Sequence, residues 1–179
     1  MSGCESLATR VTTSGVIERC EGKNLIVALG DGNIETFIIT KETDESESEL
    51  LLRGNSIELT YYEFRNQLKA EKIKTNKTYS DAIVYWVLTG DTVTAKNSIM
   101  VLYSGELLMR GPTDVKYRKW RLGGKPGKVI FTAVTNVAGT PQKIDHEATV
   151  VTDDKHSYLI FKDGRKYVKG TMNVQYDDD

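Results

Sequence analysis

The sequence predicts an all-β protein built as two successive antiparallel barrels. Short apolar segments rich in β-branched and aromatic residues recur along the 179 residues. Turn-forming Gly, Asp and Asn residues separate these segments, as expected for strands joined by tight turns. Only one stretch, acidic and poor in β-forming residues, interrupts the pattern. We expect a tether at 1–12, a small barrel at 13–75, a linker at 76–80 and a larger barrel at 81–176.

The first barrel is predicted from five alternating segments. They are 13–20, 24–29, 34–40, 56–64 and 67–74, and Gly30-Asp31-Gly32-Asn33 is the strongest hairpin turn between them. Between the third and fourth segments we predict one short helix, because Thr43 suits its N-cap and Gly54 the position just after its C-terminus. A solvated acidic loop is the alternative. Three strands, a short helix and two strands is the order of an OB-fold, so 13–75 is predicted to be an OB-like module.

The second barrel is predicted from about eight strands joined by short turns. They are 82–88, 98–103, 106–110, 115–122, 128–134, 143–151, 158–162 and 165–169. Sequential antiparallel strands of this number are most economically closed as an up-and-down barrel, because closure removes exposed edges.

Three segments of this region resemble a known family. They are Tyr117-Arg118-Lys119-Trp120-Arg121-Leu122, then Val129-Ile130-Phe131 after a Gly-rich break, then 144–150. Together they resemble the lipocalin-like domain of small lipoproteins from Gram-negative gut anaerobes, over about half of the chain. The resemblance implies a lipocalin-like antiparallel β-barrel and a place in the cell envelope, more than it implies an activity.

The sequence around Cys4 agrees with such a location. The small residues Ser2 and Gly3 before Cys4 resemble the end of a bacterial lipobox. We therefore expect Cys4 to carry a lipid that anchors the protein, without spanning, to a membrane facing the periplasm or the cell exterior. An ordinary cytoplasmic N-terminus is the alternative. The other cysteine, Cys20, does not have metal-site spacing to Cys4.

Composition and motifs argue against several function classes. The net charge of −1 gives no dominant electrostatic attraction to duplex DNA. No Gly-x-Ser-x-Gly, P-loop or His-Glu-x-x-His motif occurs. We expect no enzyme activity, cofactor or metal. His146 is interpreted as a semi-buried strand histidine, His156 with Asp153 as part of a solvated turn, and Asp145 with Glu147 as a charged strand face.

The most informative group is a set of aromatic residues in the second barrel. They are Tyr85, Trp86, Tyr103, Tyr117, Trp120, Phe131, Tyr158 and Phe161. If the barrel interior is hollow, these side chains line a pocket for a small apolar ligand; if it is filled, they form its core. The leading hypothesis is non-catalytic binding of a small apolar ligand or an envelope component.

Two other functions are kept as alternatives. One is a protein-interaction or structural module whose barrel is solid. The other is single-stranded nucleic-acid binding in the cytoplasm by the OB-like part, since exposed aromatic residues among basic ones suit stacked bases. The residues concerned are Tyr61, Tyr62, Phe64, Arg65 and Lys69.

Overall fold

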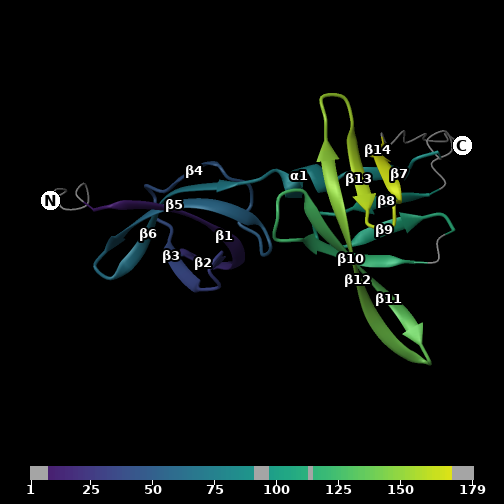
Figure 1. Ribbon diagram of the computed structural model, residues 1–179, viewed down its shortest axis with the longest axis horizontal. Helices are drawn as coiled ribbons and strands as arrows, with labels where there is room; N and C mark the ends of the chain where they lie inside the picture. Colours follow the sequence, from purple (N-terminus) through teal and green to yellow (C-terminus); the bar gives the residue numbers. More distant parts are fainter. Residues whose placement is uncertain (1–7, 91–96, 113–114, 171–179) are drawn as a thin grey trace, which may run out of the picture. The chain divides into compact units, whose positions relative to one another are not determined.

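The computed structural model describes residues 8–90, 97–112 and 115–170, which belong to two compact units (Figure 1). Unit 1 runs to Tyr79 and includes 122–126; unit 2 comprises Ser80–Arg121 and the residues from Gly127 onward. Strands dominate both units, and the described residues contain a single short helix, α1 (Thr78–Ala82). No described helix is long and apolar enough to cross a membrane. The predicted all-β class is confirmed.

Unit 1 has the strand connectivity of an OB-fold. Its strands are β1 (Arg10–Glu21), β2 (Asn24–Leu29), β3 (Ile34–Ile38), β4 (Asp44–Glu47), β5 (Ser56–Phe64) and β6 (Gln67–Thr75). The sheet order β3-β2-β1-β5-β6 is closed by a parallel pairing of β3 with β6, where Phe37 lies opposite Leu68. The predicted OB-like barrel is therefore present, with all five predicted strands.

The core of unit 1 follows from the alternation of its strands. Leu25 and Val27 on β2 face inward, and the intervening Ile26 is only partly covered. Together with side chains from β1, β3, β5 and β6 they form one buried cluster that includes Ile17, Phe37 and Leu59. Each such side chain contributes roughly 1.5–3 kcal/mol through removal from water, which fixes the register of every strand.

The helix predicted between 43 and 54 is wrong. The segment instead contains β4, which pairs in parallel with the last part of β6, so that Asp44 and Glu47 lie opposite Lys72 and Lys74. Glu47 forms ion pairs with both lysines. Thr43 is not an N-cap, because its hydroxyl donates a hydrogen bond of 2.7 Å to the carbonyl of Ala70 on β6. Pairing with a distant strand thus overrides the local helical signals.

The ends of unit 1 also differ from the expected boundaries. β1 begins at Arg10, and residues 10–12, expected in the tether, pair with β5. α1 occupies part of the expected linker. Cys4, the predicted lipid-bearing residue, lies outside the described residues.

Unit 2 is an eight-stranded antiparallel sheet that is nearly closed into a barrel. Its strands are β7 (Tyr85–Leu88), β8 (Ser98–Val101), β9 (Leu107–Arg110), β10 (Tyr117–Leu122), β11 (Lys128–Val137), β12 (Thr140–Thr152), β13 (Ser157–Phe161) and β14 (Lys166–Lys169). Each of the eight strands predicted for this region is present.

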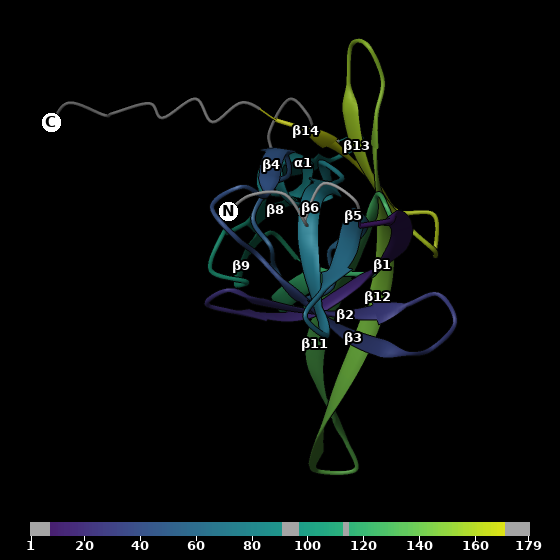
Figure 2. The same ribbon diagram turned by 90° about the vertical axis from the view of Figure 1, so that its left-hand side faces the viewer.

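The barrel closes between its first and last strands. β7 pairs with β14, with Val87 opposite Val168, and antiparallel ladders also join β11 to β12, β12 to β13, β13 to β14, β7 to β8 and β8 to β9. Between β9 and β10 the described residues form one isolated bridge, from Glu106 to Lys119. The hairpins β11–β12 and β12–β13 extend beyond the other strands in opposite directions (Figures 1 and 2).

Candidate functional site

The aromatic residues of unit 2 fall into two groups. Tyr103 is 81% exposed, and Tyr85 and Tyr158 are half-buried. The other five predicted residues are buried: Trp86, Tyr117, Trp120, Phe131 and Phe161.

Several of these buried rings fill the middle of the barrel. The rings of Tyr117 and Phe161 stack at 5.5 Å, and Phe131 lies 5.2 Å from Phe161. Each tryptophan N–H is satisfied, since Trp86 Nε1 donates to the Ala82 carbonyl and Trp120 Nε1 to that of Leu102. The predicted aromatic residues at the centre of the barrel therefore pack as core.

One of the hollows in unit 2 is a pocket of about 320 Å³. Its apolar lining comes from Leu88, Met109, Pro112 and Val115. Its polar lining comes from Asn97, Ser98, Arg110, His146, Asp163, Arg165 and Tyr167. None of the eight predicted aromatic residues lines this pocket. Among the polar residues considered in the sequence analysis, only His146 lines it.

A chain of hydrogen bonds runs from the pocket lining into the aromatic core. Arg165 donates from Nε to Asp163 Oδ2 at 2.8 Å and from Nη2 to the Tyr117 hydroxyl at 2.8 Å. The Tyr117 oxygen also lies 2.5 Å from His146 Nδ1. Because Tyr117 accepts from Arg165, its own proton is available for a hydrogen bond to His146 Nδ1.

Protonation states in this network follow from burial and charge. Burial raises the pKa of both Tyr117 and Tyr167, so both hydroxyls stay protonated at neutral pH. The hydrogen bond from Arg165 lowers the pKa of Asp163, which is therefore ionised. Burial alone would lower the pKa of Arg165, but its hydrogen bonds to Asp163 and Tyr117 outweigh this effect and raise it.

Arg165 is held rigidly from several sides. Its guanidinium lies 4.5 Å from the centre of the Phe161 ring and 5.7 Å from that of Tyr117. Asp163 fixes it from the turn between β13 and β14. A planar cation fixed by a carboxylate, a hydroxyl and aromatic faces has lost most of its rotamer freedom before any ligand arrives.

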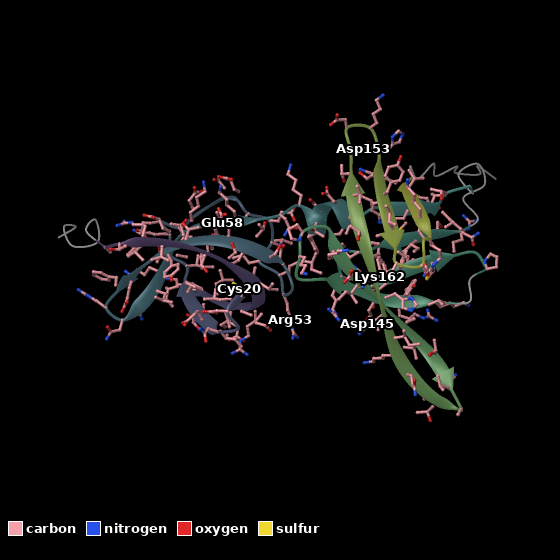
Figure 3. All side chains as sticks on the ribbon, in the orientation of Figure 1. Cys20, Arg53, Glu58, Asp145, Asp153 and Lys162 are labelled. Carbon is pink, nitrogen blue, oxygen red and sulfur yellow. The ribbon has the colours of Figure 1, made fainter. Side chains whose placement is uncertain are left out.

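The other polar residues considered from the sequence have structural partners. Asp145 accepts hydrogen bonds from Arg121 and Thr132, and Glu147 pairs with Lys128. Asp153, at the tip of the β12–β13 hairpin in Figure 3, accepts hydrogen bonds from the backbone N–H groups of Lys155 and His156. Across the described ranges, no group of three or more His, Cys, Asp or Glu side chains is placed to hold a metal ion.

The aromatic and basic residues of unit 1 also pack on one another. Tyr61 contacts the core residue Phe37, with ring centres 5.0 Å apart. The ring of Phe64 has Lys69 at 4.4 Å and Arg65 at 5.0 Å. Two cations thus already lie near Phe64, one of the three aromatic residues considered for base stacking.

Sequence reasoning missed Arg110, Asp163 and Arg165. In the sequence, Arg165 is only the first residue of the strand predicted over 165–169, and Asp163 lies just before that strand. The one local signal was an arginine two residues after the aspartate of a tight turn, a spacing that lets the two side chains pair across it.

The comparisons with known proteins add little to this geometry. No protein-family model matches the sequence, and no curated protein matches it. Among solved structures, the chain is similar to apo-CusF (residues 6–88) from Escherichia coli, at 16% identity over 42% of this chain and 98% of CusF, with a TM-score of 0.35. CusF with Ag(I) (residues 10–88) gives 17% identity over 40% and 98%, with the same TM-score. At this TM-score the similarity carries no argument, and the OB-like description of unit 1 rests on its strand order.

Proposed function

We propose that this protein is a non-catalytic binding protein that holds a small, partly apolar ligand in the pocket of its eight-stranded barrel. The observation that supports this is the composition of the pocket lining, where apolar side chains such as Leu88 and Met109 stand beside polar groups such as Ser98 and Tyr167. A concave site with apolar walls and a few converging polar groups is the usual form of a small-molecule site. Most of these groups come from strands, which hold them in place.

The pocket volume limits the ligand. A volume of 320 Å³ corresponds to about ten water molecules. A ligand of roughly ten non-hydrogen atoms therefore fits, with its apolar part against Leu88, Met109 and Val115. A larger amphiphile would have to leave part of its chain outside, because the rest of the barrel interior is filled by aromatic rings.

The ligand site can be tested with the whole protein and a panel of amphiphiles of six to ten carbons, a size set by the volume estimate above. We expect saturable binding in isothermal titration calorimetry and NMR shifts at Leu88 and Tyr167. Leu88→Trp, which fills the pocket, should abolish binding. Leu108→Trp is the matched control, because Leu108 is 59% exposed. If no member of the panel binds, the solid-barrel interaction module becomes the better account.

We also propose that the protein acts in the cell envelope, anchored through a lipid on Cys4. The support is the sequence Ser2-Gly3-Cys4, together with the lipocalin-like motifs of the second barrel. When the gene is expressed behind a lipoprotein signal peptide in a Gram-negative host, an alkyne-tagged fatty acid should label the protein. Cys4→Ser should abolish the label, whereas Cys20→Ser should keep it. A label that survives Cys4→Ser would refute the anchor.

A further inference from the structure

We infer that the ligand of this pocket carries an anionic head group, of which a carboxylate is the simplest, and that Arg165 and Arg110 bind it. This inference rests on the proposed function and adds the chemical class of the ligand. It starts from the charges of the lining, where two arginines stand against one aspartate.

The positive charge is not cancelled within the described residues. Asp163 pairs with Arg165 at 2.7 Å, so each offsets the other. Arg110, exposed at the end of β9, forms no ion pair with any other described residue. His146 also lines the pocket and contributes no negative charge. The lining therefore has an excess of positive charge, which attracts an anion more strongly in a partly enclosed site than in bulk water.

Arg165 is prepared for this role by the contacts that hold it. A guanidinium has five N–H donors, and the hydrogen bonds to Asp163 and Tyr117 use only Nε and Nη2. Nη1 takes no part in these bonds. Since Asp163, Tyr117 and Phe161 already fix the group, binding an anion would cost little further side-chain entropy.

Neutral donors of the same lining would complete the head-group site. Tyr167 keeps its proton at neutral pH, and Ser98, which is only 3% exposed, also lines the pocket. The apolar residues Leu88 and Met109 lie in the same pocket and suit the hydrocarbon part. The arrangement therefore fits a short amphiphile with a carboxylate at one end and an apolar chain at the other.

Three ligands that differ only in their head test this inference. Octanoate, 1-octanol and octylammonium are titrated into the full chain by calorimetry at pH 7 and low salt, where octanoate is ionised. We expect octanoate to bind at least about tenfold more tightly than octanol, and octylammonium not to bind. Added salt should weaken the binding of octanoate and leave that of octanol unchanged.

Two variants connect the preference to the arginines. Arg110→Gln should reduce octanoate affinity by about tenfold without changing octanol affinity. Arg165→Lys keeps the charge but removes the planar fork, and should also weaken octanoate selectively. Arg118→Gln is the matched control, because Arg118 is exposed on β10 and does not line this pocket.

The possible failures are separable. If octanol and octanoate bind equally, or if Arg110→Gln weakens both alike, the anionic head group is refuted and the proposed pocket stands. If none of the three ligands binds to the wild-type protein, both the pocket function and the anion inference are overturned.

Discussion

Replacement of Tyr117 by Phe isolates the hydrogen-bond network from the packing that surrounds it. The ring keeps its stacking on Phe161, and only the hydroxyl is lost. That hydroxyl accepts from Arg165 and lies within hydrogen-bond distance of His146, so both partners lose a bond. A hydrogen bond to a charged group contributes about 1.5–3 kcal/mol and a neutral one about 0.5–1.5 kcal/mol. Because Arg165 and His146 are partly exposed, water replaces part of this, and we expect a loss of about 2 kcal/mol.

Urea unfolding, followed by tryptophan fluorescence, measures this loss of stability in unit 2. Both tryptophans of the chain, Trp86 and Trp120, belong to unit 2, so the signal reports on the eight-stranded barrel alone. With a urea slope of about 1.5 kcal/mol per molar for a domain of this size, a loss of about 2 kcal/mol lowers the midpoint by roughly 1.3 M.

Tyr158→Phe is the matched control for this experiment. Tyr158 is a half-buried tyrosine of β13 whose hydroxyl makes no hydrogen bond to the described residues, and its ring contact with Lys166 is unchanged by the substitution. We expect its midpoint to stay within about 0.3 M of the wild type. Equal midpoints for the two variants would refute the claim that the network stabilises the barrel.

Three further predictions concern packing, backbone and pH. Phe131→Ala should lower the stability of unit 2 by about 3–5 kcal/mol in the same assay, because the ring is fully buried; a loss below about 1 kcal/mol would contradict its place in the core. Gly15→Ala should destabilise unit 1 by about 1–3 kcal/mol, because a Cβ there would lie 2.5 and 2.6 Å from atoms of β2. Gly30→Ala is the control and should be near neutral, because a Cβ at Gly30 has nothing within 4 Å. Circular dichroism melting compares the two variants, and equal melting temperatures would disprove the clash at Gly15. The hydrogen bond from Arg165 lowers the folded-state pKa of Asp163 below its unfolded value, so this stabilisation is complete above about pH 4 and is lost as the pH falls through the folded pKa; Asp163→Asn should flatten the fall in urea midpoint below pH 4, and parallel curves would count against it.

Strand positions could be predicted because local patterns decide them. In β2 the alternation of Leu25 and Val27 with less buried neighbours both forms the strand and orients it toward the core. The turn after β2 could also be predicted from the sequence, because Asp31 accepts a hydrogen bond from the backbone N–H of Asn33, two residues later. Such interactions span a few residues, so a single sequence contains all the information they need.

The failures involve partners that are distant in the chain. The acidic segment with Glu47 forms a strand because Lys72, 25 residues later, supplies its ion-pair partner. The pocket network joins Tyr117 to Arg165 across 48 residues and to His146 across 29. Nothing local marks these residues as neighbours. The aromatic residues of unit 2 stand out in the sequence, but most of them are buried in the core of the barrel.

The pairing of β7 with β14 has a consequence for how the chain folds. These two strands are the first and last of unit 2, so the ladder between Trp86 and Lys169 joins residues separated by almost the whole unit. During synthesis the barrel is an incomplete sheet with an open β7 edge until β14 leaves the ribosome. Closure over so long a loop slows folding and leaves that edge exposed to other nascent chains. We therefore expect this unit to depend on chaperones more than unit 1, whose β1–β2–β3 meander forms from adjacent segments.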